Sequence, residues 1–372
     1  MCQIPRHACR FGAALAVFLL LSAAAAAQPA VTGMRIGDDA NKTRIVIEIE
    51  KKLAYQVQVL TDPYRVVVDL PEVSWALKPS RPAGNLVSDF RFGVFKPGTS
   101  RMVFDVQKPV EVAKSFLLDP EGQFPYRLVI DLRPVTREAM LSVRPTPQPE
   151  VKERPAERPP PRPPRAAIRK IMVVLDPGHG GVDPGTVGIG GSHEKDIVLA
   201  QALDLRRQLL STGRYDVVMT RDGDSFVRLR ERIAIARDSD ADIFLSLHAD
   251  SIGNRTVRGG SIYTLSEKAS DAEAAALAAQ ENKADLIAGI DLNDQSREVV
   301  NILIDLAQRK TMNESVTFAK HLVKELGRST RMLPRTHRFA GFAVLKAPDV
   351  PSALIELGYL SNRQDERMLN EG

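Results

Sequence analysis

Cysteine is nearly absent from this chain of 372 residues, and its only examples are Cys2 and Cys9. Both lie in residues 1–27, where arginines precede an apolar run that ends in small residues. That order is typical of a cleaved secretory signal peptide, and no cysteine stands near the cleavage region to carry a lipid. We therefore expect a mature chain without disulfides, thiol chemistry, thiolate metal ligands or a stable membrane anchor.

Aromatic residues are also scarce, at 5% of the sequence, and the formal net charge is only +5. Residues 144–170 hold eight Lys and Arg against three Glu, so this one segment accounts for the whole positive excess. The rest of the chain is electrically balanced. Because nucleic-acid binding needs a basic face on the folded domain, we expect no nucleic-acid partner.

The basic segment belongs to a longer stretch, 138–168, that is rich in proline and arginine. Residues 143–165 contain nine prolines in twenty-three positions. Such a composition favours an extended, semi-rigid spacer over a packed core. We interpret 138–168 as a linker between two domains, which is also what a chain of this length predicts.

The region before the linker, 31–134, consists of short alternating runs that predict β-strands. It contains a repeat, because PYRVVVDL at 63–70 returns as PYRLVIDL at 125–132. Similar strand-like runs, 43–52 and 100–109, precede the two copies. Two copies of one strand-pair unit predict two small sheets that face each other in an all-β sandwich.

Nothing in 31–134 suggests catalysis, because the region has no histidine and no cluster of carboxylates. We interpret it as a binding or targeting domain. Its strand pattern and its doubled R-x-V-x-D-L signature resemble the AMIN domain, a module found beside cell-wall enzymes. The resemblance implies targeting to the cell envelope or to peptidoglycan.

After the linker, residues 169–372 change to alternating strands and helices. Helical patterns at 195–213 and 226–237 separate strand-like runs at 171–175, 215–220 and 242–247. This alternation predicts an α/β domain with a mainly parallel, twisted sheet flanked by helices.

Three chemically active side chains follow predicted strands of this domain. His179 stands in the glycine-rich stretch VVLDPGHGGVDPG, His248 stands in SLHADS, and Glu356 ends the run SALIE. The carboxyl ends of parallel strands share one rim, so we expect these side chains to meet there. The glycines around His179 predict a sharp turn that exposes its ring.

Two imidazoles at one site suggest zinc, which takes three protein ligands and a water molecule in catalytic centres. The chain has no H-E-x-x-H sequence, which excludes the helical zinc-protease arrangement. Without cysteine, the third ligand must be a carboxylate or another imidazole. The loop 176–195 offers Asp176, Asp183, His193 and Glu194.

Four stretches, taken in order, resemble the motifs of the zinc-dependent N-acetylmuramoyl-L-alanine amidases of the Amidase_3 family. They are LDPGHGGVDPGTVGIGGSHEKD, TRDGDSFVRLRERIAIAR, SLHADS and ALIELGYLSN, and they span most of 171–363. The resemblance implies that His179, Glu194 and His248 bind Zn2+. It also implies that Glu356 is the catalytic carboxylate, which takes a proton from water and passes it to the leaving amine.

The remaining polar residues of these motifs are given supporting roles. We interpret His193 as a packing or solvated loop residue, and Thr220, Arg221, Asp222 and Arg232 as braces for loops near the rim. Asp176 has two equally good roles: it fixes an imidazole tautomer, or it caps the N–H groups of its own loop.

Together with the AMIN-like region, the resemblance implies an enzyme similar to the periplasmic division amidases. Such an enzyme cleaves the amide between N-acetylmuramic acid and L-alanine of the stem peptide, in cell-wall remodelling and daughter-cell separation. Two alternatives stay open. A zinc peptidase that acts within the stem peptide could use the same ligands, and a wall-binding protein without activity could share the sequence pattern.

A long insertion, 269–310, begins with an alanine-rich stretch that predicts a helix of about sixteen residues. The helix could pack on the edge of the sheet, or it could be an inhibitory lid. Division amidases of the family carry a helical segment here, which covers the active site until a divisome-associated activator protein draws it away. We expect Glu281, near the middle of the helix, to offer the carboxylate that takes the fourth zinc position, with Glu273 and Asp285 as rivals.

Overall fold

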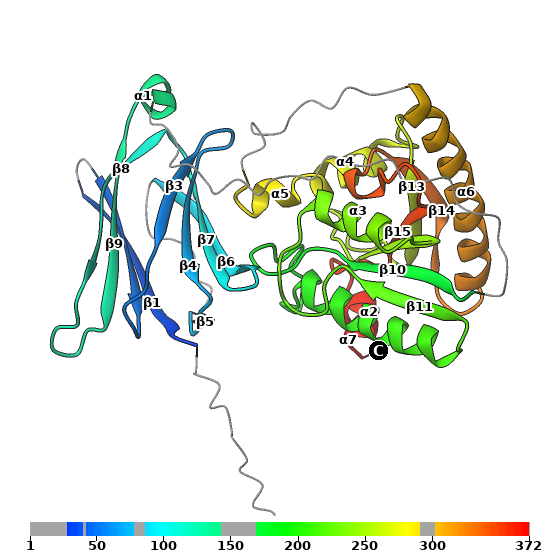
Figure 1. Cartoon of the computed structure of the whole chain (residues 1–372), viewed down its shortest axis with the longest axis horizontal. Coiled ribbons are helices and arrows are strands. Elements are labelled where there is room, and N and C mark those ends of the chain that lie inside the picture. The colour runs from blue at the N-terminus through cyan, green and yellow to red at the C-terminus, as the bar shows by residue number, and fades with distance from the viewer. Residues whose placement is uncertain (1–27, 40–41, 78–85, 143–168, 291–301, 372) are drawn as a thin grey trace, which may run out of the picture.

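A computed structural model describes residues 28–39, 42–77, 86–142, 169–290 and 302–371. It consists of an all-β region, β1 to β9, followed by an α/β region that contains β10 to β15 (Figure 1). The predicted signal peptide and residues 143–168 of the predicted linker lie outside the described residues. The first residues of that predicted linker differ from expectation, because Arg137–Ser142 form the short helix α1.

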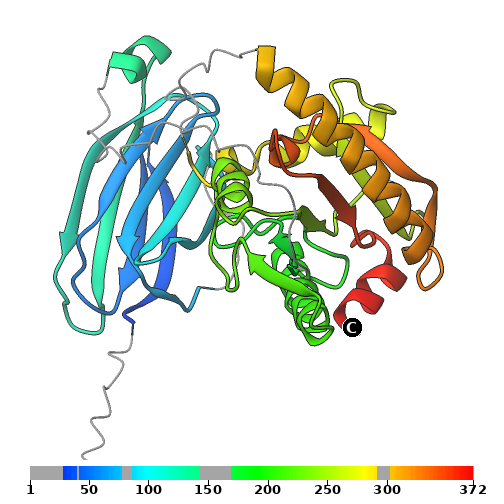
Figure 2. The ribbon, with the colours of Figure 1, turned by 45° about the vertical axis from the view of Figure 1, so that its right-hand side comes forward.

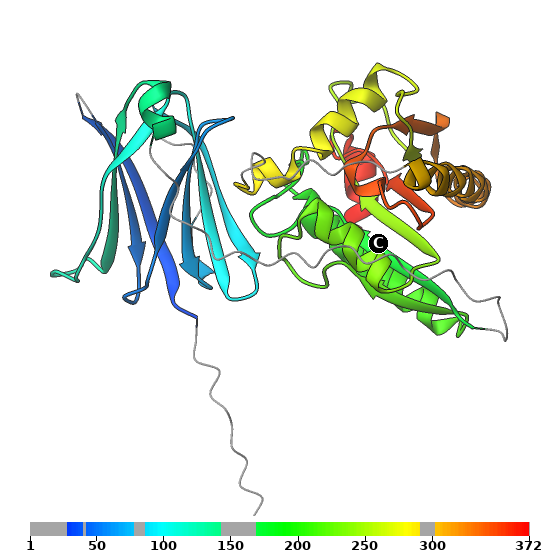
Figure 3. The same ribbon diagram turned by 45° about the horizontal axis from the view of Figure 1, so that its top comes forward.

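The N-terminal region is a β-sandwich, as the sequence predicts. Its two sheets have the strand orders β5-β1-β2-β9-β8 and β3-β4-β7-β6, and Figures 2 and 3 show them as two facing layers. Every second residue of the central strands enters a shared apolar core, which includes Ile45, Val66, Phe104 and Ile130. The strands are β1 (Ala30–Asp39), β2 (Lys42–Ile49), β3 (Gln56–Leu60), β4 (Arg65–Pro71), β5 (Ser74–Trp75), β6 (Val87–Lys96), β7 (Thr99–Val106), β8 (Val110–Leu118) and β9 (Tyr126–Pro134).

The repeated strands pair between the two copies, so the expected strand-pair unit is wrong. β2 of the first copy pairs with β9 of the second, and β4 of the first copy pairs with β7 of the second. Each strand is apolar on one face, and this alternation alone does not determine which strand becomes its neighbour. As a result, each sheet contains one strand from each copy, and the two outer faces carry the same residue pattern.

The C-terminal region is built on one six-stranded sheet in the order β11-β10-β12-β15-β13-β14. The pairs β10–β11, β10–β12, β12–β15 and β13–β14 are parallel, and β13–β15 is antiparallel. The expectation of a mainly parallel sheet is therefore confirmed. The strands are β10 (Ile171–Pro177), β11 (Tyr215–Met219), β12 (Ile243–His248), β13 (Gly260–Leu265), β14 (Met332–Ala340) and β15 (Ser352–Glu356).

Helices cover both faces of this sheet. α2 (Glu194–Ser211), α6 (Ile302–Leu326) and α7 (Arg363–Glu371) pack on one face, whose core includes Leu175 and Ala319. α3 (Leu229–Asp238), α4 (Ala272–Glu281) and the short 3-10 helix η2 (Ala343–Leu345) pack on the other, around Val174 and Phe244. Among the described helices, none combines the length and apolar character that a membrane span requires.

The insertion differs from the single helix that its sequence predicts. α4 ends at Glu281, and a second short helix, α5 (Ala284–Ile287), follows after two residues. Glu281 is therefore the last residue of α4 and does not lie near the middle of a longer helix. At the break, the side chain of Asn282 donates to the carbonyl of Gly341 and accepts from the amide of Ala343. These bonds tie the α4–α5 junction to the rest of the C-terminal region.

Candidate active site

His179, His248 and Glu356 meet at one rim of the six-stranded sheet. β10, β12 and β15 are neighbours, and His248 is the register partner of Glu356. The ring of His179, in the loop after β10, lies 5.0 Å from the ring of His248 between centroids. All three residues are buried. The structure thus brings together the three side chains that the strand ends predict.

Glycines in the loop after β10 make room for the two imidazole rings. A Cβ atom on Gly178 would lie 2.5 Å from Nε2 of His248, and one on Gly185 would lie 2.7 Å from Cδ2 of His179. His179 itself has a φ of 58°, a left-handed conformation that residues other than glycine rarely adopt. The loop holds this uncommon conformation, and it aims the ring at the rim.

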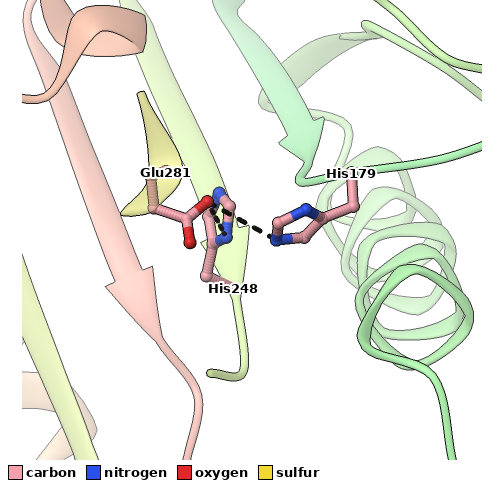
Figure 4. A group of neighbouring side chains, drawn as sticks. All are labelled: His179, His248 and Glu281. Atoms are coloured by element: carbon pink, nitrogen blue, oxygen red, sulfur yellow. Dashed lines mark ion pairs between the residues drawn. The ribbon is translucent and has the colours of Figure 1, made fainter. Parts of the chain in front are cut away.

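Four side chains converge on one point of the rim. Nε2 of His179 and Nδ1 of His248 lie 3.2 Å and 3.1 Å from the same oxygen, Oε1 of Glu194. Oε2 of Glu281 lies 3.4 Å from His179 Nε2 and 3.2 Å from His248 Nδ1 (Figure 4). Glu194 begins α2 and Glu281 ends α4, so the two carboxylates reach the rings from helices on opposite faces of the sheet.

Asp183 orients the ring of His179, a role that we expected for Asp176. Oδ2 of Asp183 lies 2.9 Å from His179 Nδ1, which leaves Nε2 to face the other three side chains. Asp176 instead accepts hydrogen bonds from side chains of three other residues, Thr220, Ser246 and Arg232. Both roles expected for Asp176, the tautomer partner and the cap of its own loop, are therefore wrong.

Two buried arginines brace the loop that carries His179. Arg221 donates to the carbonyl oxygens of Pro177, Gly178 and Lys195. Arg232 donates to those of Pro177 and His179. These contacts agree with the bracing roles expected from the sequence.

His193 stands apart from the converging side chains. It is the N-cap residue of α2, and its partly exposed ring lies 3.8 Å from the carboxylate of Asp196. This position agrees with the interpretation of His193 as a solvated loop residue.

Glu356 lies beside the four converging side chains and is held in a different way. Its Oε2 accepts a hydrogen bond from the amide of Asp250 at 3.0 Å, while its Oε1 is buried and has no hydrogen-bond partner among the described residues. Burial, together with the carboxylates of Asp250 and Glu194, raises the pKa of Glu356 well above its ordinary value. A carboxyl group of this kind is suited to proton transfer.

Of the three acidic residues considered in the insertion, Glu281 reaches the imidazoles and the other two lie elsewhere. Glu273 bonds to Arg338 and its side chain is 73% exposed. Asp285 accepts a hydrogen bond from the amide of Leu229. Of the three acidic residues, Glu281 alone ends α4, and its carboxylate lies beside His179 and His248.

The two carboxylates at the imidazoles differ in their electrostatics. Burial opposes the ionisation of Glu194, but the rings of His179 and His248 prevail and lower its pKa well below the ordinary value. Burial raises the pKa of Glu281 to about 7, because the same two rings offset only part of the cost. The two rings thus favour the anionic form of Glu194 more strongly than that of Glu281.

The donor set fits a zinc ion. His179 Nε2 and Glu281 Oε1 are buried and have no hydrogen-bond partner among the described residues. His179, His248 and Glu281 also place one donor atom each within 4.8 Å of the others. Two imidazoles and two carboxylates that face one another require protons or a cation between them, and all four are ligands that zinc accepts in tetrahedral sites.

The sequence did not predict the contacts that three residues near the rim make. These residues are Asp183, Asp250 and Gln280. Asp250 Oδ1 accepts from Thr186 Oγ1 at 2.5 Å and from Gln280 Nε2 at 2.8 Å. Asp183 was one of four acidic or histidine candidates in its loop, and Asp250 stands in the SLHADS motif. Those motifs were the available signal, but they did not show which partner each side chain takes.

An α/β sheet with two imidazoles and two carboxylates at its rim, and a buried glutamate beside them, is the arrangement expected of a metal-dependent hydrolase. Residues 173–372 match the N-acetylmuramoyl-L-alanine amidase family Amidase_3, and residues 33–132 match the AMIN domain. The chain thus belongs to the N-acetylmuramoyl-L-alanine amidase family, whose members hydrolyse peptidoglycan, and the expectation from the sequence motifs is confirmed.

Named relatives extend this match over nearly the whole chain. The chain is 36% identical over 358 residues to the N-acetylmuramoyl-L-alanine amidase AmiC of Escherichia coli O6:H1, with 92% of this chain and 85% of that protein covered. It is 35% identical over 360 residues to AmiC of Neisseria meningitidis serogroup B, with the same shares covered. Among solved structures, the catalytic domain of the amidase CwlV from Bacillus (Paenibacillus) polymyxa var. colistinus is 27% identical, covering 54% of this chain and 86% of its own, with a TM-score of 0.37.

Proposed function

We propose that this chain is a zinc-dependent amidase of the periplasm, which cleaves the bond between N-acetylmuramic acid and L-alanine during daughter-cell separation. The observation that carries the proposal is the convergence of His179 Nε2, His248 Nδ1 and Glu194 Oε1. These three atoms would hold Zn2+, which when bound would polarise the scissile carbonyl and acidify a water molecule. The predicted signal peptide supports the periplasmic location.

Glu356 would move protons in this reaction. Its raised pKa makes its carboxylate a stronger base than that of an ordinary glutamate, and its Oε1 is not engaged by another described residue. In the proposed reaction Glu356 takes a proton from the attacking water and delivers it to the amine of L-alanine as the C–N bond breaks. The amide of Asp250 fixes the orientation of the carboxyl group through the other oxygen.

The conformation described here would be an inhibited one. Glu281 contributes a fourth donor to the point where the water and the substrate carbonyl would otherwise bind. α4 presents this carboxylate from a packed position, since Ala274, Leu277 and Ala278 belong to the apolar core. An activator protein that binds the form without this contact more tightly would shift the equilibrium toward the active enzyme.

The other parts of the chain have assigned roles in this proposal. Residues 1–27 direct export, and the AMIN-like domain 31–134 directs the enzyme to the cell wall. Residues 138–168 link it to the catalytic domain 169–372, within which 269–310 is regulatory. The family matches at 33–132 and 173–372 support this division.

The test is zinc content together with product analysis on purified sacculi. We expect about one zinc ion per chain, little hydrolysis by the purified wild type, and strong hydrolysis by Glu281→Ala that leaves glycan strands free of peptide. Glu273→Ala is the matched control, because it removes a carboxylate from the same helix at an exposed position.

Each alternative has its own signature in this experiment. Cleavage within the stem peptide would identify a peptidase. A protein that binds sacculi but neither retains zinc nor cleaves them, with or without Glu281, would be a wall-binding protein.

A further inference from the structure

The N-terminal sandwich buries one of its two outer faces. In β4 and β7 the core takes Val66, Val68, Met102 and Phe104, so the alternate residues point away from the sandwich. Yet these alternate residues are also buried: Arg65 is 2% exposed, Val67 1%, Arg101 4% and Val103 0%. The outer face of a sandwich sheet is buried only when another part of the molecule covers it.

The covering part is the α5 end of the insertion. Arg65 donates to the carbonyl of Leu286, Arg91 donates to that of Ile287 at 2.5 Å, and Arg101 donates to two further carbonyls, those of Ala288 and Gly289, both at 3.1 Å. Carbonyls at the end of a helix lack partners within it, and arginine is a strong donor to such groups. Three arginines of one domain therefore hold successive carbonyls of another. Figures 1 and 3 show α5 next to the N-terminal sandwich.

Close backbone packing accompanies these hydrogen bonds. Gly289 has a φ of +72°, and a Cβ atom there would lie 2.9 Å from Val67 and 3.1 Å from Val103. Next to it, the edge strand β6 approaches the loop of His179, where a Cβ on Gly93 would lie 2.7 Å from the amide of Val182. The N-terminal domain thus contacts both the insertion and the loop that carries a candidate zinc ligand.

The contact between α5 and the N-terminal domain restrains Glu281 through a short connection. Only Asn282 and Lys283 stand between α4, which ends at Glu281, and α5, which the arginines hold. Asn282 is itself bonded to the catalytic domain, so the short connection has little freedom. A fixed α5 therefore restricts where the end of α4 can lie.

We propose that the N-terminal domain clamps the inhibitory segment, so that the face formed by Arg65, Arg91 and Arg101 holds α5 and thereby keeps Glu281 at the imidazoles. The proposal rests on the inhibitory role of Glu281 put forward above. It gives the N-terminal domain a regulatory role in addition to targeting. Loss of the clamp should release Glu281 even when the catalytic domain is unchanged.

The repeat in the sandwich supplies a matched control. Arg101 pairs with Asp69 at 2.6 and 2.8 Å, and on the opposite sheet Arg44 pairs with Asp131 at 2.6 and 2.7 Å. The two pairs occupy equivalent positions, but the side chain of Arg44 is 44% exposed and that of Arg101 is 4% exposed. Arg44→Ala removes the same bond within the sandwich as Arg101→Ala and leaves the docked face intact.

The experiment measures amide hydrogen exchange of residues 272–290 and hydrolysis of soluble peptidoglycan fragments by the full-length protein. Loss of charged hydrogen bonds to two carbonyls should raise the open population about tenfold or more in Arg101→Ala. Exchange in 272–290 and basal activity should both rise by that factor, while Arg44→Ala should match the wild type in both. Gly289→Val disrupts the same contact from the insertion side and should have the same effect as Arg101→Ala. If Arg101→Ala does not fold, Gly289→Val provides the test.

The outcomes separate this proposal from the one on which it rests. If Arg101→Ala and Gly289→Val exchange no faster over 272–290 than Arg44→Ala, the clamp is refuted, whatever Glu281→Ala does to activity. If exchange rises in both variants while neither they nor Glu281→Ala gain activity, the domain holds α5 but the inhibitory role of Glu281 is wrong. Faster exchange together with gained activity supports both.

Discussion

Asp271 gives a way to weaken α4, the helix proposed to be inhibitory, from a point remote from the imidazoles. It is the N-cap residue of α4, and its Oδ1 accepts a hydrogen bond from the amide of Ala274 at 2.9 Å. It also forms an ion pair with Arg338, whose side chain is 7% exposed. We predict that Asp271→Ala loosens α4 and raises basal activity, because a short helix that loses its cap and its anchoring ion pair is less stable.

The magnitude follows from the two contacts. Loss of an N-cap costs about 1 kcal/mol. The ion pair adds about 0.5–1 kcal/mol, since Asp271 is only partly buried and Arg338 keeps its bonds to Glu273 and Tyr263. A total of about 1.5–2 kcal/mol changes the ratio of open to closed enzyme roughly 10- to 30-fold.

The assay is release of soluble label from dye-labelled sacculi by purified wild type and variants. Glu273→Ala is the control, because Glu273 contacts the same arginine, is 73% exposed and forms no cap; its activity should stay near that of the wild type. Equal activity of Asp271→Ala and wild type, at equal zinc content and unfolding temperature, would refute the reasoning.

The pH dependence of this effect has a definite sign. Arg338 and the amide of Ala274 lower the pKa of Asp271 to about 2. Stabilisation by a carboxylate of this kind is complete above the ordinary pKa of about 3.9 and is lost as the pH falls through the folded value. The ratio of activities between Asp271→Ala and wild type should therefore be constant from about pH 5 to 8.

Three further predictions concern the site itself. Asp183→Asn should lower zinc affinity roughly 10- to 100-fold in equilibrium dialysis, since it weakens the bond that orients His179. Gly178→Ala should lose both zinc and activity, because the new Cβ would occupy the place of the His248 ring; an active, zinc-bound variant would contradict the packing argument. Removal of zinc by a chelator should lower the unfolding temperature of the catalytic domain. Zinc added at about a thousandfold excess over its Kd should raise the free energy of unfolding by about 4 kcal/mol, which calorimetry can measure.

The parts of the fold that sequence predicts well are those set by local pattern. Buried strands such as 171–175 and 352–356 are continuous apolar runs, and the rule that parallel strands end at one rim was enough to bring His179, His248 and Glu356 together. The identity of Glu194 needed more than pattern. It shares its loop with Asp176, Asp183 and His193, and the resemblance to the family motif, not the strand pattern, singled it out.

Contacts set by tertiary structure were not predictable from the sequence. The alternation of polar and apolar residues in β4 and β7 indicates an outer face, but it does not show that α5 covers that face. The crossed pairing of the repeat has the same origin, because the alternation in β2 and β4 defines a buried face but not a neighbouring strand. At the break after Glu281, Asn282 bonds to Gly341 and Ala343, which lie far along the chain. Helix propensity alone favours continuation through the junction.

In the proposed inhibited form, several modest contacts at different points hold Glu281, and their distribution would determine how an activator works. If about 1% of the enzyme is open, a partner must favour that form by about 5.5 kcal/mol to open 99% of it. Three kinds of contact hold the segment that carries Glu281. They are the cap at Asp271, the bonds of Asn282 and Gln280, and the arginine contacts to α5. An activator that competes for α5 at the outer face of the N-terminal domain would lower the remaining cost of moving Glu281 without entering the active site. On this proposal the reaction would be controlled from the boundary between the two domains, with no change required in His179, His248 or Glu194.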